Sequence, residues 1–88
     1  MEIKTLYMDC ADIYDRETAH DCLSRSLELP EYYGRNLDAL YDCLTEMPPC
    51  RIVLKNVSSL RAIGDYGYAI LEVLSDAAGD RADFVIYE

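Results

Sequence analysis

The chain has 88 residues, of which 51% are hydrophobic, and this length leaves room for one small domain with an apolar core but not for two. Seventeen acidic residues against eight basic ones give a formal net charge of −9 at pH 7. Because this charge repels polyanions over about 8–10 Å at physiological ionic strength, we expect neither nucleic acid nor an anionic membrane as a partner. A basic protein is the partner that such a surface favours, and we expect residues 1–88 to form a single domain.

No targeting or membrane-spanning segment is recognisable in the sequence. The first ten residues, MEIKTLYMDC, lack a basic stretch followed by an apolar one, and no run of eighteen apolar residues occurs. We therefore expect a cytoplasmic protein. Acidity that serves solubility alone is an open alternative to acidity that serves a partner.

The four cysteines, Cys10, Cys22, Cys43 and Cys50, have neither the C-x-x-C spacing nor a histidine at metal-ligand intervals. We therefore expect structural thiols, no metal site and no cofactor. A bridge between Cys43 and Cys50 is compatible with their separation in the sequence, but a reducing cytoplasm disfavours it.

The predicted elements begin with a strand over residues 2–8, where polar and apolar side chains alternate imperfectly. A helix follows, with Asp15 as its N-cap and Glu17 in its first turn, and Pro30 is expected to end it. His20 lies off the apolar stripe of this helix and is expected at the surface. The stripe itself comprises Ala19, Cys22, Leu23, Ser26 and Leu27.

The rest of the chain alternates strands and helices. Strands separated by helices pair in parallel through right-handed crossovers, so we expect an α/β fold with a small three-stranded parallel sheet packed by three to four helices. The elements predicted are a helix over 35–47 with Asn36 as N-cap, a strand over 51–57, a short helix near Leu60, a long helix over 65–78 with Gly79 just past its end, and a strand over 83–87.

The helix predicted over 35–47 carries an acidic stripe. Asp38 and Asp42 are four residues apart and share one face. Like charges at this spacing repel by about 0.2–0.5 kcal/mol on an exposed helix, and only Arg35 is placed to offset the charge of Asp38. A helical wheel puts Leu37, Leu40, Cys43 and Leu44 on the apolar face, and Asp38, Asp42 and Thr45 on the polar face with Tyr41 at the border.

The long helix repeats this arrangement with Glu72, Asp76 and Asp80. Solvated helix faces are one interpretation of the two stripes. A general acid and base would need one carboxylate desolvated in a pocket, and a calcium site would need ligands at loop spacing that the sequence lacks. The carboxylates would otherwise meet Arg and Lys of a partner in place of phosphates, which the neighbouring tyrosines favour.

The segment LELPEYYGRNLDALYDCLTEM, residues 27–47, closely resembles the barstar family of intracellular inhibitors of barnase-like, guanyl-specific ribonucleases. Weaker, collinear similarity continues through IVLK and LEVLSDAAGDRADFVIY, so the resemblance extends over most of the chain. It implies a three-stranded parallel sheet packed by helices and no catalytic activity. It also implies a 1:1 complex in which the second helix and its preceding loop plug the active site of a basic ribonuclease.

The resemblance also implies which residues bind the partner. Asp42 matches the family's central aspartate, whose carboxylate occupies a phosphate subsite among Arg and His side chains of the enzyme. Asp76 matches a glutamate that pairs with a basic residue at the rim, Asp80 matches a further acidic position, and Tyr41 and Met47 stand where the family has tryptophan. The expected partner-binding residues are Tyr32, Tyr33, Gly34, Asn36, Leu37, Asp38, Tyr41, Asp42, Thr45, Met47, Asp76 and Asp80.

Several alternatives stay open. Either Tyr32 or Tyr33 would also suit the core, and Gly34 would serve either a close approach of the partner or a positive φ before the helix. An immunity or regulatory module for a different basic toxin or nuclease would share the same fold. A divalent-metal-dependent hydrolase would use pairs of carboxylates, Asp38 with Asp42 or Asp76 with Asp80.

Overall fold

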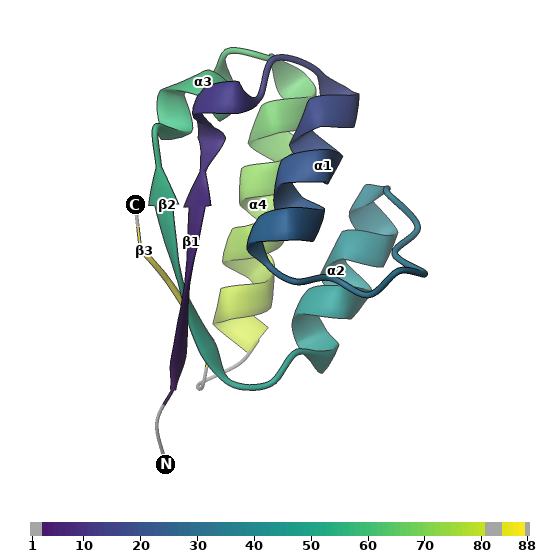
Figure 1. Cartoon of the computed structure of the whole chain (residues 1–88), viewed down its shortest axis with the longest axis vertical. Helices are drawn as coiled ribbons and strands as arrows, with labels where there is room; N and C mark the ends of the chain where they lie inside the picture. The colour runs from purple at the N-terminus through teal and green to yellow at the C-terminus, as the bar shows by residue number, and fades with distance from the viewer. Residues whose placement is uncertain (1–2, 81–83, 88) are drawn as a thin grey trace.

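The computed structural model describes residues 3–80 and 84–87 (Figure 1). Within them the chain alternates between strands and helices, as the sequence predicts. The elements are β1 (Lys4–Asp9), a 3-10 turn η1 (Cys10–Asp12), α1 (Arg16–Ser26), α2 (Leu37–Glu46), β2 (Cys50–Lys55), α3 (Val57–Arg61), α4 (Asp65–Asp80) and β3 (Phe84–Tyr87).

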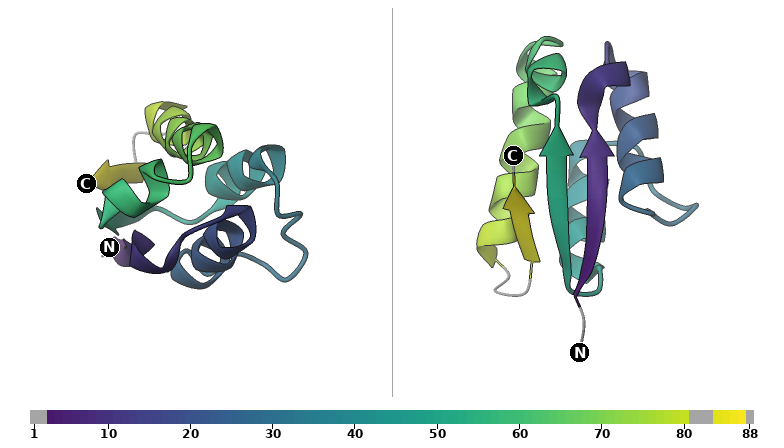
Figure 2. Two further views of the ribbon diagram at one scale, coloured as in Figure 1. Left: turned by 90° about the horizontal axis from the view of Figure 1, so that it is seen from above. Right: turned by 60° about the vertical axis from the view of Figure 1, so that its left-hand side comes forward.

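The strands pair in parallel in the order β1-β2-β3, and the expected mixed α/β class with a parallel sheet is confirmed. Leu6 stands opposite Ile52 and Met8 opposite Leu54, and all four side chains are buried. The long helices lie on one side of the sheet (Figure 2). Because side chains alternate along a strand, Tyr7 points away from the helices and is 61% exposed.

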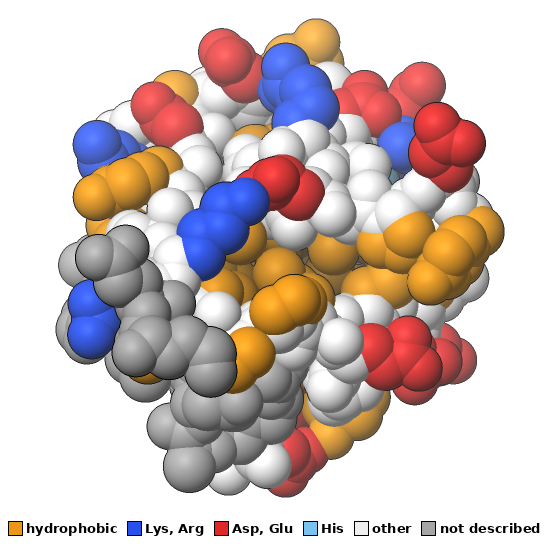
Figure 3. All heavy atoms as spheres, turned by 60° about the horizontal axis from the view of Figure 1, so that its bottom comes forward, with side chains coloured by type: hydrophobic (Ala, Val, Ile, Leu, Met, Phe, Trp, Pro, Cys, Tyr) orange, Lys and Arg blue, Asp and Glu red, His pale blue; other side chains and the backbone are white. Residues whose placement is uncertain are grey.

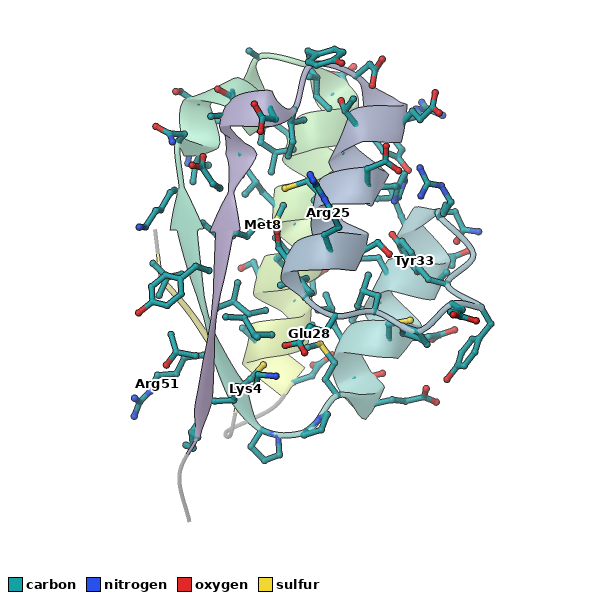
Figure 4. All side chains as sticks on the ribbon, viewed as in Figure 1. Lys4, Met8, Arg25, Glu28, Tyr33 and Arg51 are labelled. Carbon is teal, nitrogen blue, oxygen red and sulfur yellow. The ribbon has the colours of Figure 1, made fainter. Side chains whose placement is uncertain are left out.

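The core fills the space between this sheet and the helices. Met8 projects from β1 toward the helices (Figure 4) and is completely buried. Fully buried leucines and isoleucines come from every helix and from β2: Leu23, Leu40, Leu44, Ile52, Leu60 and Ile70.

All four cysteines are free thiols, and burial raises the pKa of Cys10 to about 11. Within the described residues, no helix combines the length and apolar character that crossing a bilayer requires.

Helix α1 begins where the sequence predicts and ends earlier. The Asp15 carboxylate accepts from the Thr18 amide at 2.8 Å, while the Thr18 hydroxyl accepts from the Asp15 amide at 3.0 Å, which forms a capping box. The helix ends at Ser26 because Glu28 takes a left-handed φ of 53° and the Leu29 amide turns back to the Ser24 carbonyl at 3.0 Å. The expectation that Pro30 ends this helix was therefore wrong.

Helix α4 is longer than predicted, because it continues through Gly79 to Asp80. The expectation of Gly79 as a residue past the helix end was wrong. The glycine that matters for packing is Gly67, where an added Cβ would lie 1.9 Å from the Leu60 carbonyl oxygen of α3. Its missing side chain therefore lets α3 and α4 pack closely.

The substitution Gly67→Ala should lower the free energy of unfolding by about 1–3 kcal/mol, the usual range for overpacked positions, because α3 must move away from α4. Urea unfolding followed by circular dichroism measures this change. Gly79→Ala is the matched control in the same helix, since an added Cβ there meets nothing within 4 Å. We expect this control to gain up to about 1 kcal/mol from helix propensity. Equal effects at both positions would contradict the close approach.

Candidate functional site

Helix α2 and the loop before it form one edge of the molecule, with α2 packed against α4 (Figure 1). Asn36 is the N-cap of α2, as predicted: its side-chain oxygen accepts from the Ala39 amide at 2.8 Å. Its Nδ2 donates to the Gly34 carbonyl at 3.2 Å, which ties the loop to the first turn. The start of the helix and the end of the loop are therefore held by one side chain.

The loop reaches α2 through a left-handed residue, but this residue is Arg35 with φ 55° rather than Gly34. The suggested positive φ at Gly34 was therefore wrong. A Cβ at Gly34 would lie 3.2 Å from the Ala39 Cβ, which is a tight contact. A small residue at this position lets the loop pass close to the first turn of α2.

The predicted division of α2 into two faces agrees with burial. Leu40 and Leu44 are completely buried and Leu37 is half-buried, whereas Asp38 and Asp42 are exposed. Thr45 is partly buried, and its hydroxyl donates to the Asp42 carbonyl at 2.9 Å.

Arg35 does not offset the charge of Asp38. Its Nη2 forms an ion pair with Asp21 of α1 at 2.8 Å and donates to the Glu17 carbonyl at 3.2 Å. Within residues 3–80 and 84–87, neither Asp38 nor Asp42 takes part in an ion pair. The guanidinium therefore fastens the loop to α1 and leaves the acidic face of α2 uncompensated.

Tyr41 joins the two acidic helices. Its hydroxyl donates a hydrogen bond to the Asp80 carboxylate of α4. The pKa of Tyr41 is raised, first by this bond, then by burial, and then by the negative charges of Asp80, Asp76 and Asp42. The structure thus gathers the acidic residues predicted on two separate helices around one phenol, and all three carboxylates are exposed.

The two adjacent tyrosines of the loop point in opposite directions. Tyr32 is 81% exposed and Tyr33 only 7%. The Tyr33 hydroxyl lies 2.6 Å from His20 Nδ1, and His20 Nε2 lies 2.6 Å from the hydroxyl of Tyr66 in α4. Figure 4 shows Tyr33 where the loop meets the helices. Tyr33 is thus the core tyrosine of the pair.

His20 is 3% exposed, so the expectation of a surface histidine was wrong. Its helix position lies beside the apolar stripe, and its two partners are 13 and 46 residues away in the sequence. A buried histidine is stable only if its ring nitrogens are satisfied. No local pattern could reveal these partners, because the fold brings them together.

The lower end of the surface, which is the part at the C-terminal end of α2 in Figure 1, is apolar. Met47 is half-buried there and lines two adjoining hollows. One, of about 230 Å³, lies beside Tyr32, and the other, of about 260 Å³, opens at the bottom of the molecule. Figure 3 shows hydrophobic side chains gathered in the view from below. Residues that line both hollows are Glu28, Pro30, Met47 and Pro48.

These side chains support binding better than catalysis. In the described ranges, no three His, Cys, Asp or Glu side chains lie close enough together to hold a metal ion. The carboxylates stand on convex helix faces in solvent, where little desolvation is available to separate an acid from a base. Exposed carboxylates beside tyrosines are suited to accept charge-assisted hydrogen bonds from Arg and Lys of another protein.

The fold and this surface define a small acidic α/β protein with exposed carboxylates on two packed helices. Residues 3–87 match the family described as "Barstar (barnase inhibitor)". The chain is also 40% identical over 84 residues to the "Putative ribonuclease inhibitor YrdF" of Bacillus subtilis (strain 168), with 92% of each chain covered. The protein belongs to the barstar family, as its sequence predicted.

The substitution Asn36→Ala should lower the free energy of unfolding by about 1 kcal/mol, because the Ala39 amide loses its acceptor at the helix start. Thermal unfolding followed by circular dichroism is a suitable measurement. The matched variant Asn36→Asp keeps an accepting oxygen and adds a charge that the helix dipole favours, and it loses only the exposed bond to the Gly34 carbonyl, so it should stay within about 0.5 kcal/mol of the native chain. Similar losses in both variants would mean that the cap does not account for the effect.

Proposed function

We propose that this protein inhibits a barnase-like ribonuclease by occupying its active site with α2 and the preceding loop. The observation that carries the proposal is the exposed Asp42 carboxylate, which stands without an ion pair in the described structure beside further acidic residues of α2 and α4. Membership of the barstar family and the name of the Bacillus relative support the same role.

In the proposed complex, Asp42 stands in for an RNA phosphate. Its carboxylate would accept hydrogen bonds from cationic side chains that otherwise bind the substrate. Tyr32, which is 81% exposed, would supply a rigid aromatic contact, while Tyr33 would act through the position of the loop because its own side chain is buried. Asp76 and Asp80 would contact basic residues at the rim.

The net charge of −9 adds long-range attraction to a basic enzyme. Such attraction accelerates encounter and weakens as salt is added. We further propose a single barstar-like domain, cytoplasmic and without enzymatic activity or cofactor, that forms a 1:1 complex. Gly34, Asn36, Leu37, Asp38, Tyr41, Thr45 and Met47 complete the proposed contact surface.

A second candidate is an immunity or regulatory protein for a different basic toxin or nuclease. The observation that favours it is the apolar lower end of the surface, where Met47 lies beside hollows of about 230 and 260 Å³. The family has tryptophan at this position and at that of Tyr41. An enzyme with a differently shaped rim would fit such a surface.

Asp42→Asn should raise the inhibition constant about 100-fold or more, because removing one partner of a buried ion pair costs about 3–5 kcal/mol. The measurement is RNA cleavage by barnase titrated with the protein at low and high salt. The native chain should inhibit stoichiometrically and less tightly at high salt.

The matched control for this experiment is Asp12→Asn, which removes the same charge from the η1 turn, outside α2, α4 and the loop before α2. This variant should inhibit within about threefold of the native chain, since only long-range attraction changes. Failure of the native chain to inhibit barnase would contradict the proposed partner. Equal inhibition by the two variants would contradict the central role of Asp42.

A further inference from the structure

The loop before α2 is attached to the body of the protein at a buried polar junction. The Tyr33 hydroxyl and the Tyr66 hydroxyl lie on either side of the His20 ring, each 2.6 Å from a ring nitrogen. The three residues come from the loop, from α4 and from α1. His20 and Tyr33 are 3% and 7% exposed, so water competes little for this junction. The position of the loop is therefore linked to the state of one imidazole.

A neutral imidazole has one N–H donor and one acceptor nitrogen. With a hydroxyl at each nitrogen, the ring donates to one tyrosine and accepts from the other, so both contacts are satisfied. Protonation makes both nitrogens donors, and the hydroxyl that donated to the ring loses its acceptor. His20 is the hydrogen-bond partner that the structure gives the Tyr33 hydroxyl. Both phenol oxygens can accept from a charged ring, but one hydroxyl hydrogen is then left without its acceptor, so the neutral ring satisfies this buried junction more fully.

The charged groups around His20 also oppose a positive ring. The Arg16 guanidinium lies 4.1 Å from the centre of the Tyr66 ring, and Arg35 lines the same cavity of about 310 Å³ as His20. Two carboxylates lie near these cations. Glu17 lines this cavity too, and Asp21 is paired with Arg35. The pKa of Tyr33 is raised first by burial, then by Tyr66, and then electrostatically by Cys43 of α2. The pKa of His20 is lowered, first by burial and then by the charges of Arg35 and Arg16, against a smaller opposing effect of Asp21.

We propose that His20 is the positioning residue of the binding loop: its neutral ring holds Tyr33, and thereby Tyr32, in the conformation that binds the partner, and protonation releases them. The consequence for binding rests on the proposed function, whereas the consequence for the loop does not. Because the loop has no regular structure of its own, it yields before the helices do.

The direction of the pH dependence follows from linkage. Since the folded pKa of His20 lies below the unfolded value of about 6.5, the unfolded chain binds more protons between these two values. The stabilising contribution of His20 is fully present above about pH 6.5 and is lost as the pH falls toward the folded pKa. Loop ordering and partner affinity should decline over the same range.

The first test needs no partner. The Tyr33 amide donates to the Pro30 carbonyl at 3.0 Å, so its hydrogen exchange, relative to that of Ile70 in α4, reports local opening of the loop. In the native chain this ratio, corrected for intrinsic rates, should rise about three- to tenfold from about pH 7.5 to about pH 5.5. In His20→Gln, which keeps polar atoms but does not titrate, the ratio should stay constant.

Two further variants separate positioning from general stability. Tyr33→Phe removes the hydroxyl on the loop, and Tyr66→Phe removes the one on α4. Tyr33→Phe should raise the relative exchange of the loop at both pH values and abolish its pH dependence, whereas Tyr66→Phe should leave the loop closer to native. This pair keeps the test decisive if His20→Gln does not fold. An unchanged ratio in the native chain, or equal effects of both tyrosine variants, would overturn the proposal.

The second test measures the dissociation constant for barnase at about pH 7.5 and about pH 5.5 with the native chain and with His20→Gln. For each protein, the dissociation constant at about pH 5.5 is divided by that at about pH 7.5. Titration of groups on the enzyme changes this ratio equally for the native chain and for His20→Gln, so a difference between the two ratios is due to His20. We expect a native ratio about three- to tenfold larger. Equal ratios in two proteins that bind would overturn the effect on binding. Absence of binding by the native chain would contradict the proposed function and leave the exchange test to decide the role of His20.

Discussion

The acidic surface depends on the burial of two leucines. Leu40 and Leu44 are completely buried where α2 packs against the rest of the core. Full burial of a leucine side chain is worth about 1.5–3 kcal/mol, whereas two carboxylates one turn apart repel by only about 0.2–0.5 kcal/mol. Burial therefore decides the rotation of α2 about its axis. With that rotation fixed, Asp38 and Asp42 must face solvent, whatever their mutual repulsion.

Packing of α2 on α4 then brings a second acidic helix to the same surface. The hydrogen bond between Tyr41 and Asp80 crosses this interface, so the phenol holds one carboxylate in place while Asp42 and Asp76 stay in solvent. Side chains that project from packed helices lose less freedom on binding than side chains on loose loops. In the proposed complex, these carboxylates would act as a preorganised set of acceptors, which would offset their small mutual repulsion in the free protein.

Local sequence patterns predicted most of the fold. The N-cap residues of α1 and α2, the apolar stripes and the strands each depend on a few neighbouring residues, and the structure agrees with the predictions at Asp15, Asn36, Leu40 and Leu44. The errors arose where a distant segment decides the outcome. Tertiary contacts bury His20, and Arg35 pairs with Asp21 of α1 rather than with Asp38 of the helix that follows it. Helix α4 also continues through Gly79 to Asp80, which the local glycine signal did not predict.

The surface is therefore built from two units with different supports. The acidic residues belong to α2 and α4, which are held by apolar packing. The loop depends on α1: the Leu29 amide bonds to Ser24, the Tyr33 hydroxyl to His20, and the Arg35 guanidinium to Asp21. Apolar packing is indifferent to pH, but the attachment of Tyr33 involves the titratable ring of His20. The Asn36 side chain joins the two units, because it bonds to both the Gly34 carbonyl and the Ala39 amide. A change in α1 would therefore act first on the loop that carries Tyr32, whereas Asp42 is held by the apolar packing of Leu40 and Leu44.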